Sequence, residues 1–379
     1  MLDRMAVGEI ARKPHTALRS KGNVLRYEHC LTRAGFEGAY SILYHEQRPH
    51  ALRLERSQRR SRPAIGVHDH RLRRHFRASQ LDSAQSAAPA NLLTSNSINV
   101  SIWKPQGEDA HYQVLADEDA LLFVREGSGT LRSVFGDLEF SANDYVCVPK
   151  GVLHRFLWKG PCEVLRMDCN DLAIPSQFRN ALGQLRMDAP YSHRDFRRPT
   201  FVGPQDEHIR EIMIVRRDAT LFAAIEHSPL DVIGWDGTVY PWAFPILAFQ
   251  PRVGSVHLPP TAHGTFCAEG VLICSFVPRM LDFGDNAIPC PYPHSSTDID
   301  EVIYYVSGEF GSRHGIEKGS ITLHARGVPH GPQPGRYEAS LGQSSTQELA
   351  VMLDCRDPLS VSETAEVLED GNYEASFSS

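Results

Sequence analysis

The chain has 379 residues, of which 41% are hydrophobic and 22% are charged, and its formal net charge is −7. This length is enough for two hydrophobic cores, and the acidic balance argues against a general nucleic-acid-binding protein. The sequence has no apolar run long enough to span a membrane, and its first residues lack the apolar segment of a secretory signal.

The eight cysteines form no Cys-x-x-Cys pair. They are scattered among apolar residues, which predicts buried, reduced thiols and a cytoplasmic location rather than a zinc finger or a redox pair.

Residues 1–90 are predicted to form an N-terminal segment that packs on the rest of the protein. Within it, residues 51–79 contain nine arginines and little apolar periodicity. The absence of interleaved aromatic residues favours a solvated loop or a subunit-contact arm over a nucleic-acid-binding arm. Residues 81–91 have the composition of a linker.

Short runs of β-branched and aromatic residues then alternate with turn residues, among 28 Gly and 25 Pro in all. They predict strands, whereas helices are expected only at 175–185 and 362–368. This pattern is typical of an all-β protein with closed or sandwiched sheets. The predicted strands are 99–105, 120–127, 144–151, 163–169, 244–252, 272–279, 301–308 and 349–355.

An internal repeat divides this β region. Residues 144–154 align without gaps on residues 320–330, and Asp119 aligns on Glu301. Two copies of one barrel explain the match, so we expect a bicupin, with two cupin or jelly-roll-like barrels and few short helices. The expected division is a degenerate first cupin plus connector at 91–225, a second cupin at 226–360, and an acidic tail at 361–379 with a surface helix and a loose end.

The second copy carries a candidate metal site. His294, Glu301 and His330 are expected on neighbouring strands of one barrel. Two imidazoles and one carboxylate bind one face of an octahedral Fe(II) and leave the opposite face open to a substrate and O2. Because side chains alternate along a strand, Asp300 should point away from the metal that Glu301 faces.

The first copy has a similar but altered set, namely His111, Asp119 and His154. Its carboxylate is one methylene shorter, and its first spacing differs by one residue, so two possibilities stay open. Either this barrel binds a metal, or it is a relic in which His154 caps a turn.

Several residues near the second site could form an aromatic substrate pocket. His324 belongs with them because it aligns on Val148 and should point into or near the cavity. Each of these residues could instead be core packing. The pocket candidates are Tyr240, Tyr292, Tyr305, Phe310 and His324. The basic candidates for a substrate carboxylate are Arg279, Arg313, His263, His314 and Arg326.

Over nearly its whole length the sequence resembles the homogentisate 1,2-dioxygenase family. The most specific motifs are PYPHSSTDIDEV at 291–302 and VPHGPQPG at 328–335, with VIGWDGTVYPW at 232–242 in support. The resemblance implies that His294, Glu301 and His330 bind iron. It also implies Fe(II)-dependent ring cleavage of a small 1,4-dihydroxylated aromatic acid by O2, in tyrosine and phenylalanine breakdown. Family members assemble as homo-oligomers, either trimers or dimers of trimers.

Two positions depart from the family pattern. Asp236 stands where the family has a His that is thought to take the substrate's proton, and Phe310 stands where it has a Tyr. Asp236 is therefore a candidate catalytic base or else a turn residue. A different hydroquinone- or catechol-type acid is a competing substrate. A metal-dependent cupin isomerase, oxidase or decarboxylase acting on a small acid, and a non-catalytic bicupin, are competing functions.

Overall fold

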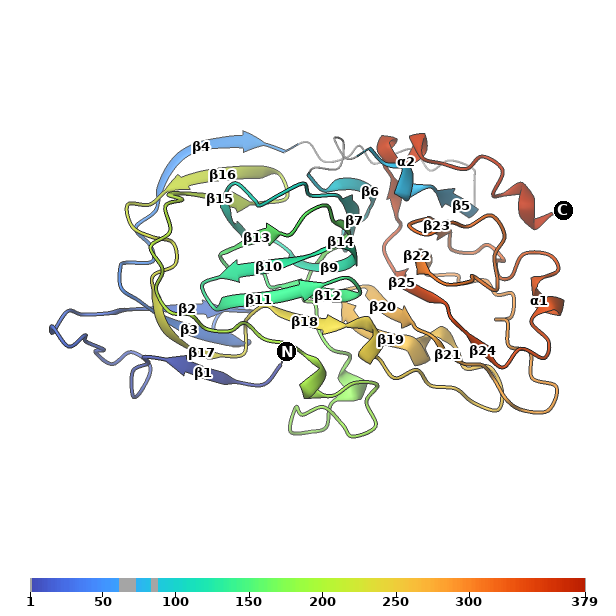
Figure 1. The fold of residues 1–379 in the computed structure, drawn as a ribbon, viewed down its shortest axis with the longest axis horizontal. Helices are drawn as coiled ribbons and strands as arrows, with labels where there is room; N and C mark the ends of the chain where they lie inside the picture. Colours follow the sequence, from blue (N-terminus) through green and yellow to red (C-terminus); the bar gives the residue numbers. More distant parts are fainter. Residues whose placement is uncertain (1, 61–72, 83–87, 379) are drawn as a thin grey trace. The chain divides into compact units, whose positions relative to one another are not determined.

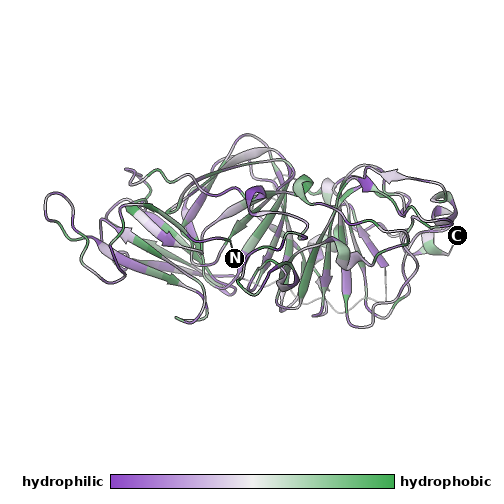
Figure 2. Ribbon diagram, turned by 90° about the horizontal axis from the view of Figure 1, so that it is seen from below, coloured by the Kyte–Doolittle hydropathy of each residue, from purple (hydrophilic) through white to green (hydrophobic). Residues whose placement is uncertain are grey.

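The computed structural model describes residues 2–60, 73–82 and 88–378 (Figure 1). Strands dominate these residues, and the α-helices among them are two short ones, α1 (Arg336–Ala339) and α2 (Glu363–Val367). Hydrophobic residues concentrate on the strands (Figure 2). The expected all-β, cupin-type fold is confirmed.

The chain forms two compact units that are interleaved in sequence. Unit 1 contains Met1–Arg62, Pro105–Glu163 and His193–Phe244, and unit 2 contains Pro63–Lys104, Val164–Ser192 and Pro245–Ser379. The contiguous segments expected from the sequence, with boundaries at residues 90, 225 and 360, do not coincide with these units. The reason is that strand pairing joins segments far apart in the chain, such as β5 (Arg73–Phe76) with β23 (Ile321–His324).

Unit 1 contains a small four-stranded antiparallel sheet. Its order is β1 (Met5–Gly8), β17 (Val232–Gly237), β3 (Tyr40–His45) and β2 (Tyr27–Thr32). A seven-stranded sheet follows the order β11 (Gly136–Ser141), β10 (Ser128–Ser133), β13 (His154–Trp158), β8 (Tyr112–Leu115), β15 (Glu211–Val215), β16 (Ala219–Ala224) and β4 (Arg53–Arg59). The strands β9 (Asp119–Glu126), β12 (Asp144–Val148) and β18 (Trp242–Pro245) belong to the same unit.

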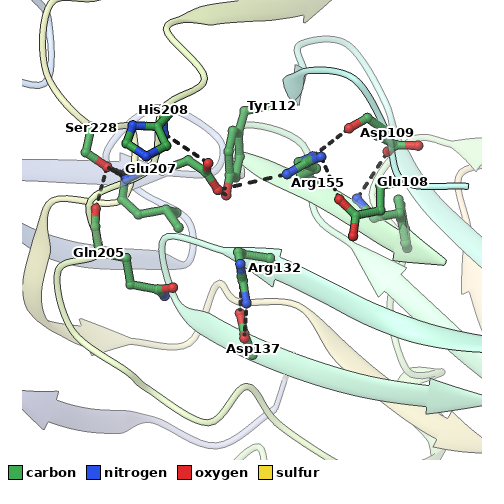
Figure 3. A network of polar contacts seen from close by, with 12 residues as sticks. Glu108, Asp109, Tyr112, Arg132, Asp137, Arg155, Gln205, Glu207, His208 and Ser228 are labelled. Carbon is green, nitrogen blue, oxygen red and sulfur yellow. Dashed lines mark hydrogen bonds and ion pairs between the residues drawn. The ribbon is translucent and has the colours of Figure 1, made fainter. Parts of the chain in front are cut away.

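A polar network ties the extended residues around Glu207 to strands β8 and β13 in unit 1 (Figure 3). The Tyr112 hydroxyl donates to Glu207 at 2.9 Å, and the Arg155 guanidinium lies 3.9 Å from the same carboxylate. Burial is the largest cause of the raised pKa of Tyr112, and the hydrogen bond to Glu207 is the second. The tyrosine therefore stays neutral and serves as a donor.

Unit 2 is built on a six-stranded sheet. Its order is β19 (Gly264–Ala268), β20 (Val271–Phe276), β25 (Leu349–Cys355), β22 (Asp300–Ser307), β23 and β5. A second group comprises β14 (Glu163–Cys169), β7 (Ile98–Trp103), β6 (Ala90–Thr94) and β26 (Ser360–Val361), and a two-stranded ribbon joins β21 (Arg279–Met280) to β24 (Ser345–Thr346). On β22, Glu301 pairs with His324 of β23 and Asp354 of β25.

Two expected elements are wrong. The helix expected at 175–185 is a 3₁₀ turn at Ser176–Phe178, because the Asn180 side chain accepts from the backbone N–H groups of Leu182 and Gln184 and closes a turn instead. The strand expected at 244–252 ends with β18 at Pro245 and continues as a 3₁₀ turn at Ile246–Ala248.

The arginine-rich segment is not a simple loop. Strand β4 within it is exposed along its length, and Arg56 of this strand forms an ion pair with Glu211 and lies over the Phe222 ring at 3.9 Å. Strand β5 is largely buried. Residues 61–72 of this segment, and residues 83–87 of the predicted linker, lie outside the described residues.

The expected C-terminal helix is confirmed as α2, whose N-cap Ser362 accepts a hydrogen bond from the Ala365 N–H. The expectation of a loose end after it is wrong. Tyr373 is buried, and Glu369 forms an ion pair with Arg74 at 2.7 Å in which both side chains are 5% exposed. These contacts hold residues 369 and 373 on unit 2.

Candidate metal centre

Three potential metal ligands meet beside strand β22. Glu301 is the second residue of this strand, whereas His294 precedes it and His330 follows the turn after β23. The backbone N–H of each histidine donates to the carbonyl of the other at 2.8 Å, which forms an isolated bridge. Their rings meet edge-on, with centroids 4.3 Å apart.

The ligand atoms converge on one point. The Nε2 atoms of His330 and His294 lie 3.7 and 3.9 Å from the Glu301 oxygens, and the three ligand atoms all lie within 4.8 Å of one another. A metal bound at about 2.1 Å by adjacent octahedral ligands holds them roughly 3 Å apart, so small side-chain movements suffice. His330 Nε2 is buried and has no hydrogen-bond partner, as expected of an atom that is a metal ligand. The three residues therefore fit a divalent metal.

Backbone carbonyls orient both imidazoles. The Nδ1 of His330 lies 2.9 Å from the Val328 carbonyl oxygen, and the Nδ1 of His294 lies 3.3 Å from that of Tyr292. Because a carbonyl only accepts, Nδ1 carries the proton and Nε2 keeps its lone pair toward Glu301. This arrangement is the usual support of a metal-binding histidine.

A second pair of side chains supports the carboxylate. His324 Nδ1 donates to Glu301 Oε1 at 2.7 Å, and His324 Nε2 lies 3.1 Å from the Tyr373 hydroxyl. Since Nδ1 is the donor, Nε2 accepts from the tyrosine. Burial lowers the pKa of His324 to about 4, so its imidazole is neutral. Burial raises the pKa of Glu301, but its interactions with His324, above all the hydrogen bond from Nδ1, and with His330 outweigh burial and hold that pKa well below its usual range.

A cavity of about 150 Å³ opens on this centre. His294 and Glu301 line it, together with aromatic and apolar side chains and several charged ones. It offers a mixed surface on which both a ring and an acid group could bind. The lining includes Leu258, His263, Phe276, Arg279, Ile303, Tyr305 and Arg313.

Comparisons with known proteins agree with this geometry. A family model described as "Homogentisate 1,2-dioxygenase N-terminal" matches residues 81–246. A protein of Saccharolobus solfataricus named "Putative dioxygenase" is 32% identical over 377 residues, which cover 98% of this chain and 97% of that protein. The chain belongs to the homogentisate 1,2-dioxygenase family. It is therefore a dioxygenase-type enzyme of the cupin fold.

More distant relatives carry the family's name directly. The homogentisate 1,2-dioxygenase of Nitrobacter hamburgensis is 25% identical over 75% of this chain and 64% of its own length. That of Caenorhabditis elegans is 25% identical over 59% of this chain and 52% of its own. Among solved structures, a cupin 2 conserved barrel domain protein from Leptotrichia buccalis covers 78% of this chain and 99% of that chain, at 8% identity and a TM-score of 0.34.

The predicted pocket residues lie in different environments within this dioxygenase. Tyr305 lines the cavity, and Phe310 packs on its ring with centroids 4.7 Å apart. Tyr292 is half exposed, and its ring lies edge-on to His257. His324 does not lie in the cavity, since it is fully buried behind Glu301, where it supports the carboxylate.

Asp236 and Tyr240 belong to unit 1, whereas the described lining of the cavity lies in unit 2. The Arg4 guanidinium donates to both oxygens of Asp236, from Nε at 2.7 Å and from Nη2 at 2.6 Å. The Tyr240 hydroxyl donates to the Asp3 carbonyl at 2.8 Å. Both side chains thus have partners within unit 1, and the roles of Asp236 as base and of Tyr240 as substrate contact stay predictions.

The first barrel of the dioxygenase does not assemble the altered ligand set. Arg33 donates to both oxygens of Asp119, at 2.7 and 3.0 Å, so an ion pair stands where the second barrel has its metal carboxylate. His154 pairs across strands with Gln113, whereas His111 contacts Glu211 at 3.1 Å. Gln113 is thus the counterpart of His294. In the described part of the chain, His294, Glu301 and His330 are the one group with metal-binding geometry.

Two residues near Glu301, Tyr373 and Asp354, were not predicted from the sequence. Tyr373 lies in an acidic tail with no periodic pattern, so no signal pointed to it. Asp354 could have been found from the pairing of 301–308 with 349–355, because it lies directly across from Glu301. Burial and the charge of Glu301 raise the pKa of Asp354 to about 7.

Among the described residues, no helix has the length and apolar character to cross a bilayer.

Proposed function

We propose that this dioxygenase cleaves the ring of a homogentisate-like hydroquinone acid with O2, and that its metal is Fe(II). The observation that carries the proposal is the convergence of His294, Glu301 and His330 at the wall of a cavity of about 150 Å³. The names of the distant relatives support the substrate class.

The donor set favours iron over a structural metal. Two neutral imidazole nitrogens and one carboxylate, with no thiolate among them, are the ligands of non-haem Fe(II) oxygenases. When bound, Fe(II) would supply the redox chemistry that allows O2 to react with an electron-rich ring.

The chain's own residues bind and shield the substrate. Phe276, Ile303 and Tyr305 provide aromatic and apolar surface against which a ring can pack and from which water is excluded. Neutral His324 keeps Glu301 ionised and fixed in orientation, so the carboxylate needs no rearrangement when a substrate enters.

Oxygen uptake tests the proposal. Metal-free protein is loaded anaerobically with Fe(II), Mn(II) or Zn(II) and mixed with homogentisate, gentisate or unsubstituted hydroquinone in air-saturated buffer. We expect one O2 consumed per ring only with Fe(II), and loss of both metal and turnover in His330→Ala. As a control, Arg356→Gln changes an exposed arginine of the same unit and should retain both.

The competing functions give different results. Stoichiometric Mn or Zn after native purification, with no oxygen uptake on any ring after Fe(II) loading, would favour an isomerase, oxidase or decarboxylase acting on a small acid. We also propose a homo-oligomer, a trimer or a dimer of trimers, which light scattering of the purified protein tests.

A further inference from the structure

The cavity wall contains a buried cation without an acidic partner. Arg313 is 6% exposed and lines the cavity. Within the described part of the chain, no carboxylate forms an ion pair with it. Two other arginines of unit 2 differ, because Arg279 pairs with Glu348 at 3.3 Å and Arg326 pairs with Asp300 at 3.0 Å.

The guanidinium of Arg313 interacts with the hydroxyls of Tyr305 and Tyr373 and with two backbone carbonyls, none of which carries a negative charge. Nη1 donates to the Gly331 carbonyl at 2.6 Å and to the Ser312 carbonyl at 3.2 Å. The Nε atom is buried and has no partner. Because Gly331 directly follows the ligand His330, its hydrogen bond with Nη1 places the guanidinium beside the metal centre.

A buried guanidinium of this kind is costly unless something compensates its charge. Glu301 is close enough to interact with it electrostatically. Once a divalent cation is bound, however, that carboxylate is shared with the metal. The metal's two positive charges and that of Arg313 then exceed the single negative charge of Glu301. Asp282 and Glu348 also line the cavity, but they contact His257 and Arg279, so an anionic ligand would neutralise the excess positive charge beside the metal.

We propose that Arg313 binds the carboxylate of the substrate and so selects ring acids over uncharged hydroquinones. The inference rests on the proposed function and deepens it, since it assigns the acid group to one side chain. A guanidinium presents several N–H donors in a planar fork that matches a carboxylate, which a lysine does not. The ring of such a substrate would then lie against Tyr305, which adjoins Arg313 in the same wall.

Anaerobic calorimetry tests this without turnover. Homogentisate and its methyl ester are titrated into Zn(II)-loaded wild type, Arg313→Gln and Arg313→Lys, with Arg356→Gln as the control for the loss of one exposed positive charge. For Arg313→Gln we expect homogentisate to bind at least about tenfold more weakly, with the ester changed less than about threefold. Arg313→Lys should lie between wild type and Arg313→Gln.

Equal weakening of acid and ester would overturn the proposal, because it indicates a structural role. Unchanged binding of the acid would also overturn it. Should Arg313→Gln fail to fold, Arg313→Lys still decides, since a change in the ratio of acid to ester affinity requires contact with the carboxylate. Failure of the proposed function is separate. If Fe(II)-loaded protein cleaves no ring, an Arg313-dependent preference for the acid would still stand, whereas ring cleavage without that preference removes only this inference.

Discussion

The Nε2 atom of His324 lies 3.1 Å from the hydroxyl of Tyr373, a residue of the last C-terminal segment. The Tyr373 proton determines which nitrogen of His324 is free to donate to Glu301. The orientation of a metal ligand on β22 therefore depends on a side chain seventy-two positions further along the chain.

Tyr373→Phe should weaken metal binding while the fold is kept. The change removes one hydroxyl, so His324 can take the other tautomer and no longer donates reliably to Glu301. Loss of such supporting contacts costs about 10- to 100-fold in metal affinity. Competition with a chelator measures the Kd for Fe(II) or Zn(II). Tyr337→Phe, a partly exposed tyrosine of α1, is the matched control, and equal affinities in the two variants would contradict the prediction.

Glu369→Gln should destabilise the protein through the buried ion pair with Arg74. Both side chains are 5% exposed, and removing one partner leaves the other charge buried and unpaired. We expect a loss of about 3 kcal/mol in the free energy of unfolding, measured by urea denaturation. The double variant Arg74→Gln/Glu369→Gln should recover part of this loss. A double variant that loses the sum of the two single effects would show that the pair is not coupled.

Metal content should depend on the second barrel alone. Asp119→Asn breaks the ion pair with Arg33 and should lower stability but leave one metal per chain. Glu301→Gln should remove the metal. Elemental analysis of both variants after identical loading provides the comparison, and half the wild-type metal in Asp119→Asn would indicate a second site in the first barrel.

His263 should make the protein acid-sensitive. Burial, aided by the charges of Arg279 and His257, lowers the pKa of His263 to about 3. The unfolded chain binds a proton at this residue below about pH 6.5 and the native state does not, so stability falls as pH decreases from 6.5 toward 3.

His263→Gln removes this source of pH dependence. Between pH 7 and pH 4, the variant should lose about 3 kcal/mol less unfolding free energy than wild type. Chemical denaturation at both pH values measures the difference, and identical pH dependence in the two proteins would refute the assignment. His29 in unit 1, whose pKa burial lowers to about 4, is present in both proteins and cancels.

The arrangement of the metal ligands could be predicted because the residues around each ligand form recognisable local sequence patterns. Glu301 opens a run of β-branched and aromatic residues, and strand alternation correctly turned Asp300 away, where it accepts from the Arg326 and Leu359 backbone N–H groups. The turn before His330 also follows from its residues. The repeat correctly indicated two related barrels.

Other features depend on contacts that no local pattern records. Its spacing before Asp119 placed His111 in the first ligand position, but the cross-strand partner of His154 is Gln113, because pairing register and not spacing determines which residues face each other. The alignment with Val148 predicted that His324 points into or near the cavity. In the structure His324 lies across from Glu301 on β23 and hydrogen-bonds its carboxylate. The burial of Tyr373 depends on tertiary packing of the tail.

The pairing of β5 with β23 also has a consequence for biosynthesis. The ribosome makes residues 73–76 early, yet their partner strand does not exist until residue 324 has emerged. Unit 1, whose last strand ends near Phe244, can be complete while unit 2 still has unpaired edges. Nascent chains are thus exposed to misassembly over that interval, and a chaperone that shields strand edges would raise the yield of native enzyme.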